Sequence, residues 1–87
     1  MDSNTTTLFD VEEIDEALIA KTLKEVFEAI EERGHNPVNQ LVGYIMSGDP
    51  GYISNHREAR SKISKLERTK IIEVLVKNYF DKILWEY

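Results

Sequence analysis

The side chains most open to chemistry are the hydroxyl groups at the start of the chain. Ser3, Thr5, Thr6 and Thr7 lie in a polar segment, residues 1–9, that has few large apolar side chains. Because so little apolar burial cannot offset the entropy lost on ordering, we predict a disordered tail. A Ser/Thr kinase can take such hydroxyls into its active site without first melting a helix. The chemistry they suggest is acceptance of a phosphoryl group, although many polar tails carry no modification.

Two other sets of side chains could support metal binding or catalysis, but neither has the spacing required. His35 and His56 are the only histidines, cysteine is absent, and no helical His-x-x-x-His or His-x-x-x-Asp spacing is present. Ser47 and Asp49 could act as nucleophile and acid, but no local motif places a base beside them, and turn chemistry accounts for Ser-Gly-Asp-Pro-Gly. The chain also lacks a GxxxxGK[ST] phosphate-binding loop. We therefore predict no catalytic residues, no metal and no cofactor, and a chain that is not an enzyme.

A basic segment keeps nucleic-acid binding open as an alternative function. Residues 55–70 hold six Lys or Arg side chains and two Glu, a side-chain sum of +4. A short helix, a turn and a basic helix could imitate a helix-turn-helix, but the connection between Ser47 and Asn55 is longer than the usual three or four residues. The whole chain, with 11 basic and 16 acidic side chains, has a net charge of −5, which argues against nucleic acid. A small nucleic-acid-binding helical regulator is therefore the second hypothesis.

Apolar periodicity predicts a single all-α domain behind the tail. Apolar side chains recur every three or four positions, which places them on one face of a helix. The four predicted helices cover residues 15–33, 37–47, 55–66 and 69–84. We therefore divide the chain into a disordered acidic, Thr-rich regulatory tail, residues 1–13, and a compact four-helix dimerisation domain, residues 14–87.

Glycine and proline mark where the helices break. Gly34 suits the left-handed position past a helix end, and Asn36 before a proline supplies the N-cap of the next helix. Gly48 suits the corresponding position after the second helix. Pro50-Gly51 fits the centre of a type II turn.

The two middle helices are expected to carry narrower apolar faces. The second is predicted to turn toward the core Val38, Leu41, Val42, Ile45 and Met46. Gly43 inside it costs about 1 kcal/mol relative to alanine, so it indicates a close approach or a bend, of which we favour close packing against another helix. Asn55 followed by Glu58 resembles a capping box that opens the third helix. The third helix is expected to be mostly surface, with a thin apolar stripe of Ala59, Ile63 and Leu66.

The fourth helix has more apolar surface than one copy of the chain can cover. Its apolar side chains project around most of the helix, so it must be buried on more than one side. Three short neighbours can hardly cover it, and chains of only 87 residues bury a modest core. We therefore predict a symmetric homodimer whose interface contains Ile72, Leu75, Val76, Tyr79 and Phe80.

Charge divides the chain into an acidic start and a basic later segment. Residues 1–16 carry six acidic side chains and no basic one, whereas residues 55–70 sum to +4. The two could meet in one chain or between neighbours, or both could simply be solvated, since exposed charge pairs are worth under about 1 kcal/mol. The start lacks the apolar stretch of a signal peptide, and no apolar run approaches the ~20 residues that span a bilayer. We expect a cytoplasmic protein without membrane insertion.

The middle of the chain carries motifs that resemble a known family. The matching pieces are GHNPVNQ at residues 34–40, VGY at 42–44, SGDP at 47–50, YI at 52–53, AR at 59–60, KLER at 65–68 and the helix at 71–79. On these motifs the chain resembles the IreB family of small regulatory phosphoproteins from Gram-positive bacteria, over roughly residues 18–80. It departs from the family where Ser54-Asn55 replaces the usual Pro-Arg and where His35 replaces a tyrosine.

This resemblance implies a function and a set of phosphorylation sites. The family is phosphorylated on N-terminal threonines by a transmembrane PASTA-domain Ser/Thr kinase, and one of these threonines lies three residues before a phenylalanine. That spacing here is Thr6 to Phe9, while Ser3 stands near the second position, so Thr5 and Thr7 remain candidate substitutes. The resemblance therefore implies a non-enzymatic regulatory phosphoprotein in cell-envelope stress signalling, acting on a downstream protein that the sequence does not identify.

A phosphate on the tail would act through its charge. It adds about −1.5 to −2 charge at neutral pH together with three strong acceptor oxygens. It would either repel the carboxylates of the tail or bind basic side chains of residues 55–70. The candidates for phosphate docking are Arg57, Arg60 and Lys65.

Overall fold

The computed structural model describes residues 15–86 with their side chains, and within that range every regular element is helical. The α-helices are α1 (Asp2–Glu32), α2 (Pro37–Ser47), α3 (Ala59–Ser64) and α4 (Arg68–Glu86), and the 3-10 turns are η1 (Pro50–Tyr52) and η2 (His56–Glu58). The predicted all-α class is thus confirmed. The predicted disordered tail, residues 1–13, lies outside the described residues and stays a prediction.

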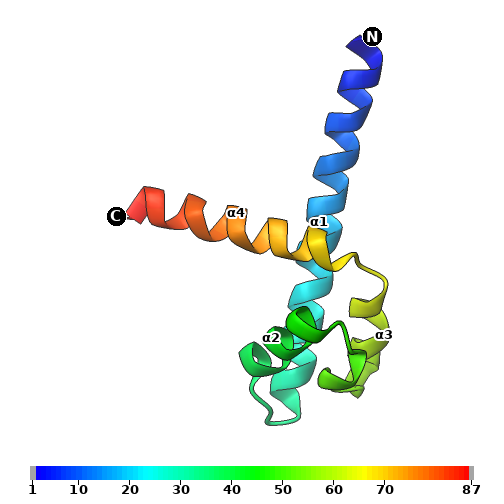
Figure 1. The fold of residues 1–87 in the computed structure, drawn as a ribbon, viewed down its shortest axis with the longest axis vertical. Helices are drawn as coiled ribbons and strands as arrows, with labels where there is room; N and C mark the ends of the chain where they lie inside the picture. Colours follow the sequence, from blue (N-terminus) through cyan, green and yellow to red (C-terminus); the bar gives the residue numbers. More distant parts are fainter. Residues whose placement is uncertain (1, 87) are drawn as a thin grey trace.

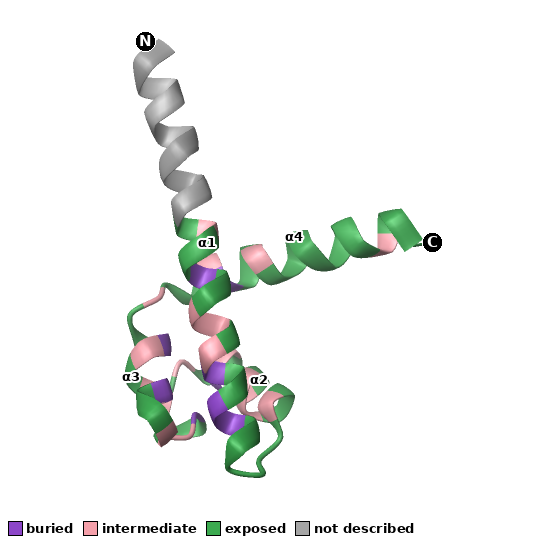
Figure 2. Cartoon of the chain, turned by 180° about the vertical axis from the view of Figure 1, so that it is seen from behind, coloured by how far each residue is buried: buried purple, intermediate pink, exposed green. Residues whose placement is uncertain are grey.

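The helices do not close into a compact bundle. In Figure 1, α2 and α3 flank one end of α1, while α4 projects sideways from α1. Figure 2 shows most of α4 in the colour of exposed residues. Within residues 68–86, Ile71 alone is buried. The fourth helix therefore leaves the body of the chain after its first turns.

The core lies where α1, α2, α3, the first turns of α4 and the residue after η1 meet. Its buried side chains are Ile19, Val26, Ala29, Ile30, Tyr44, Ile53, Ala59, Ile63 and Ile71. The apolar face predicted for residues 15–33 is confirmed at three of its positions, because Ile19, Val26 and Ile30 are buried. The thin stripe on the third helix is confirmed at Ala59 and Ile63, and Leu66 is partly buried beside them.

The breaks around α2 follow the predicted chemistry. Gly34 and Gly48 have φ of 77° and 76°, the left-handed conformation that glycine adopts without steric cost. The side chain of Asn36 accepts a hydrogen bond of 3.1 Å from the Asn39 amide, so it is the N-cap. The Gly48 amide donates to the Tyr44 carbonyl at 2.7 Å and closes the other end. The second helix therefore has the predicted bounds, residues 37–47.

Two local predictions were wrong. Gly51 does not take the positive φ of a type II turn, because the Asp49 carboxylate accepts its amide at 2.9 Å and holds Pro50–Tyr52 in a 3-10 turn. Asn55 forms no capping hydrogen bond within the described part of the chain. Instead, Arg57 and Glu58 take left-handed φ values of 53° and 60°, which delays the third α-helix until Ala59.

The packing of α2 also differs from the prediction. Tyr44 is its buried side chain, whereas Val38, Val42 and Met46, predicted to face the core, are 59%, 52% and 79% exposed. Leu41 and Ile45 are partly buried. Gly43 does mark a close approach, but the neighbour is the Tyr52 ring of η1, which a Cβ atom would overlap, and not another helix. The turn after α2 folds back onto the helix.

Candidate interaction surfaces

An apolar groove opens between α1, α2 and the base of α4. Its volume is about 460 Å³, and Lys24 is the charged residue that contributes to its lining. The apolar lining residues are Leu23, Phe27, Val38, Leu41, Val42, Ile45, Ile71 and Leu75. Two of the α2 side chains that miss the core, Val38 and Val42, form one wall of this groove together with the partly buried Leu41 and Ile45. The sequence did not reveal the groove because helical periodicity marks an apolar face without saying what covers it.

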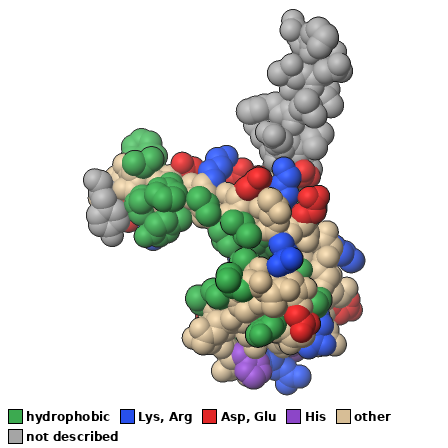
Figure 3. All heavy atoms as spheres, viewed as in Figure 1, with side chains coloured by type: hydrophobic (Ala, Val, Ile, Leu, Met, Phe, Trp, Pro, Cys, Tyr) green, Lys and Arg blue, Asp and Glu red, His purple; other side chains and the backbone are tan. Residues whose placement is uncertain are grey.

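The outer part of α4 extends the apolar surface away from the groove. All five predicted interface residues lie on the surface of the single chain, with exposed fractions from 42% at Ile72 to 61% at Tyr79. Leu84 and Trp85, absent from that prediction, are 77% and 89% exposed. Figure 3 shows the apolar side chains running along α4 and continuing onto the body beneath it. Contiguous exposed apolar patches are typical of binding surfaces.

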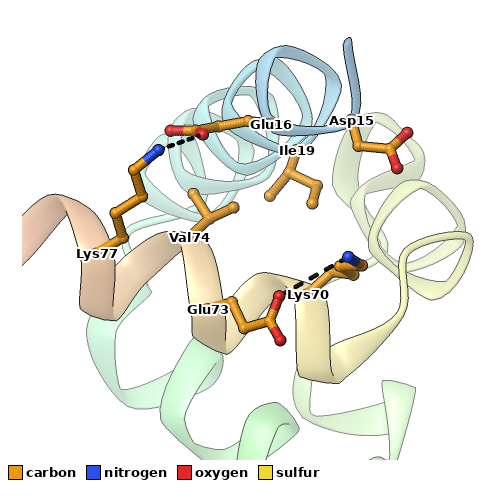
Figure 4. Close-up of a pocket in the computed structure, with 7 residues that line it drawn as sticks. All are labelled: Asp15, Glu16, Ile19, Lys70, Glu73, Val74 and Lys77. Atoms are coloured by element: carbon orange, nitrogen blue, oxygen red, sulfur yellow. Dashed lines mark hydrogen bonds and ion pairs between the residues drawn. The ribbon is translucent and has the colours of Figure 1, made fainter. Parts of the chain in front are cut away.

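A polar clamp attaches α4 to α1 on the other side. One oxygen of Glu16 accepts from Lys77 at 3.1 Å and the other from Asn78 at 3.4 Å, and Figure 4 shows Lys77 reaching across to Glu16. Asn78 also donates to the Val74 carbonyl at 2.7 Å. The hydrogen bond from Lys77, with that from Asn78, holds the pKa of the Glu16 carboxyl below its usual range. This clamp adds polar contacts to the burial of Ile71 in positioning α4.

Opposite charges also line the contact between α1 and the α3 segment. Glu32 lies 2.8 Å from His56 Nε2 and 2.9 Å from the Arg57 guanidinium, and the hydrogen bond to His56 is the main cause that lowers the Glu32 pKa. Lys62 lies 3.5 Å from Glu25. These pairs join the basic segment, residues 55–70, to carboxylates of α1 that follow the acidic start, so the pairing of residues 1–16 with residues 55–70 stays a prediction.

The three residues predicted to dock phosphate do not form one site. Arg57 binds Glu32 at the end of α1, and Arg60 donates from Nε to the Ile53 carbonyl at 3.0 Å. Lys65 instead lines a hollow with Asp15, at the first described turn of α1. Asp15 and Glu32 are 17 residues apart, about 25 Å along a helix. The predicted phosphoacceptors, residues 5–7, lie outside the described residues.

The polar side chains of the turn after α2 form hydrogen bonds with nearby backbone groups. The Ser47 hydroxyl donates to the Gly43 carbonyl at 2.7 Å and accepts the Asp49 amide at 3.0 Å. The Arg68 guanidinium donates to the Ile45 carbonyl at 2.8 Å and lies against Gly48. The SGDP and KLER motifs therefore meet in space, a contact that neither motif indicated alone. The hydrogen bonds of Ser47 and Asp49 give these residues a structural role.

The described region was compared with two kinds of site, a metal-binding cluster and a membrane-spanning helix. Across residues 15–86, no three His, Asp or Glu side chains converge as a metal site would require. None of the described helices combines the length and apolar character needed to cross a bilayer. The surfaces with a clear chemical character are therefore the apolar groove, the outer face of α4 and the lysine-containing hollows.

These features define a class, a small helical protein with exposed apolar faces suited to protein binding. Residues 4–81 match the family model described as IreB regulatory phosphoprotein. The chain is also 51% identical over 81 residues to a UPF0297 protein of Lachnoclostridium phytofermentans, covering 93% of this chain and 92% of that protein. The chain belongs to the IreB family of regulatory phosphoproteins, which confirms the resemblance and supports a regulatory role.

Proposed function

We propose that this chain is a non-enzymatic regulatory phosphoprotein of the cytoplasm that acts by binding other proteins. The observation that carries the proposal is the family match, which begins at residue 4 and so includes the threonines at 5–7 together with the helical domain. Thr6, three residues before Phe9, is the proposed main acceptor, with Thr5 and Thr7 as substitutes. The proposed modifying enzyme is a PASTA-domain Ser/Thr kinase of cell-envelope stress signalling, and the regulated protein is a separate downstream partner.

We also propose that a second copy of the chain covers the apolar groove. The groove and the outer face of α4 belong to the same chain, and Leu75 lies on both. A two-fold axis beside Leu75 would let each α4 fill the groove of the other copy, so that one contact is made twice. Burial of apolar area at roughly 25 cal/mol per Å² then stabilises the pair without any further partner. The proposed interface contains Ile72, Leu75, Val76, Tyr79 and Phe80.

Phosphoacceptor identity is tested with a PASTA-type kinase and intact-mass measurement. Thr6→Ala is expected to lose most of the phosphate incorporated by the unchanged chain. Thr69→Ala is the matched control, because Thr69 is an exposed threonine in the folded part and its loss should leave incorporation unchanged. Equal incorporation in Thr6→Ala and in the unchanged chain would assign the reaction to another hydroxyl, with Thr5 and Thr7 examined next by fragment masses.

Nucleic-acid binding receives less support from the geometry. Arg57 and Lys62, which would have faced a phosphate backbone, lie within 4 Å of α1 carboxylates, and Arg60 is bonded to a backbone carbonyl. Real phosphate contacts would give binding that falls steeply with salt. We expect no binding to DNA or RNA, even at low ionic strength.

A further inference from the structure

The segment that leads into α3, residues 54–58, has a strained backbone. Within residues 15–86, a positive φ outside glycine is confined to Arg57 and Glu58, with φ of 53° and 60°. These values lie in the left-handed region, where the Cβ atom of an L-residue crowds the following carbonyl oxygen, so each residue costs energy. Such strain persists only where surrounding contacts enforce it. The contacts of this segment must therefore hold both residues in place.

One carboxylate from another helix holds the segment. Glu32, the last residue of α1, lies 2.8 Å from His56 Nε2 and accepts a hydrogen bond of 2.9 Å from the Arg57 guanidinium. A local contact adds to these, because the Glu58 amide donates to the Asn55 carbonyl at 3.1 Å. Glu32 therefore decides where the side chains of His56 and Arg57 point.

The contacts to Glu32 are weak. The side chains of His56, Arg57 and Glu32 are 28%, 55% and 49% exposed, so water and salt screen their attraction. Glu32 also lies in the last turn of α1, where the helix dipole disfavours a carboxylate, and that turn contains no basic side chain of its own. The strain of two left-handed residues is at least of the same order as such exposed pairs. The Glu32 contacts therefore leave little margin for the observed conformation.

The residue types of the segment also suit a longer α3. Asparagine, here Asn55, is a preferred N-cap, and an acidic side chain such as Glu58 is favourable in a first helical turn. A right-handed turn over residues 56–58 would remove the strain. It would also give the Ala59 amide the Asn55 carbonyl, in place of its present 3-10 bond to His56. The same residues can therefore form a left-handed turn or the first turn of a helix.

A longer α3 changes the position of Arg57. Successive residues of an α-helix are about 100° apart around its axis, so Arg57 would lie about 200° from the buried Ala59, on the opposite side of the helix. Ala59 belongs to the core that α3 shares with α1. The Arg57 side chain would therefore leave Glu32 and lie on the outer face of α3.

We propose that α3 has two forms and that Glu32 selects the shorter one. In the short form α3 begins at Ala59, and Glu32 holds His56 and Arg57 beside the end of α1. In the long form residues 56–58 are right-handed, and Arg57 is free on the outer face of α3. A group that binds only one position of Arg57 shifts the population toward that form. The segment is thus a conformational switch that depends on neither the proposed phosphoacceptor nor the proposed dimer.

The first test compares the full chain with its Glu32→Ala variant by NMR. A positive φ brings the amide and Hα protons of one residue close together, so Arg57 and Glu58 of the unchanged chain should show strong intraresidue NOEs. We expect these NOEs to weaken in Glu32→Ala, because a right-handed helix moves the two protons apart. Glu31→Ala is the matched control and should leave them strong, since Glu31 is an exposed neighbour in α1 without a side-chain partner in the described region. Weakened NOEs in both variants, or in neither, would overturn the proposal.

The second test measures the strain with glycine. Glycine adopts a left-handed conformation without steric cost, but it destabilises a helix. Glu58→Gly should therefore raise the midpoint of urea unfolding of the unchanged chain and of Glu31→Ala, and lower the midpoint of Glu32→Ala. A change of the same sign in all three chains contradicts the two forms.

A salt series decides the case in which Glu32→Ala does not fold. The unchanged chain then needs no substitution, because about 0.5 M salt strongly screens exposed ion pairs. The intraresidue NOEs of Arg57 and Glu58 should weaken as the salt concentration rises. Constant NOEs up to that concentration would show that the Glu32 contacts do not select the short form.

Discussion

Truncation of Leu75 should weaken the proposed dimer by an amount that the structure defines. Leu75 is 45% exposed in the single chain and lines the groove. Full burial of a leucine side chain is worth about 1.5–3 kcal/mol, so a partner that covers the exposed half contributes about 1 kcal/mol. Two-fold symmetry counts this contact twice. Leu75→Ala should therefore cost about 2 kcal/mol per dimer, roughly a thirtyfold rise in the dissociation constant.

The assay is sedimentation equilibrium over a concentration series, with thermal unfolding as a check on folding. Leu18→Ala is the matched control, because Leu18 is 52% exposed but lies outside the groove lining. We expect the unchanged chain and Leu18→Ala to sediment at twice the chain mass of 10.1 kDa at micromolar concentration. A stronger variant, Leu75→Asp, should give monomers, since an unpaired buried charge costs several kcal/mol. A monomeric unchanged chain, or equal weakening by Leu18→Ala and Leu75→Ala, would refute the reasoning.

Three further predictions concern stability. The pKa values of Glu16 and Glu32 are lowered, so their contacts stabilise the fold fully above the ordinary carboxyl pKa of 4.5. This stability is lost as the pH falls through the lowered pKa values. Glu16→Gln and Glu32→Gln should therefore each reduce the fall in melting temperature at acid pH. Gly43→Ala should destabilise the fold, because the new Cβ atom would overlap the Tyr52 ring, although alanine favours a helix by about 1 kcal/mol. In a Tyr52→Ala background the same change should stabilise the fold. A double-mutant cycle of denaturant unfolding measures this reversal. Arg68→Met should lower the free energy of unfolding in urea by about 1–2 kcal/mol, because it removes the charged donor to the Ile45 carbonyl. An unchanged unfolding midpoint would show that water replaces that donor without loss.

Local sequence signals predicted the helix ends best. The conformations of Gly34 and Gly48 and the Asn36 cap depend on residues next to one another, so their types are sufficient to predict them. The errors arose where one particular side chain selects between structures that the residue types alone allow. The Asp49 side chain selected a 3-10 turn over a type II turn, and Tyr52 occupied the space above Gly43.

The interaction surfaces were predicted in part. Apolar residues around the whole fourth helix indicated that one copy could not cover it, and the exposed α4 face agrees with that expectation. The opposite wall, on α2, was assigned to the core because periodicity cannot distinguish a core face from a groove face. The sequence treated the basic residues as one segment. In the structure α3 runs beside α1, so Arg57 lies at Glu32, Lys62 at Glu25 and Lys65 beside Asp15.

The two faces of α4 have different roles in the proposed assembly. Ile71, Val74 and the Glu16 clamp attach the helix to α1, and the remaining apolar side chains face away from the single chain. A partner copy that fills the groove must therefore meet α4 at the angle which this attachment sets.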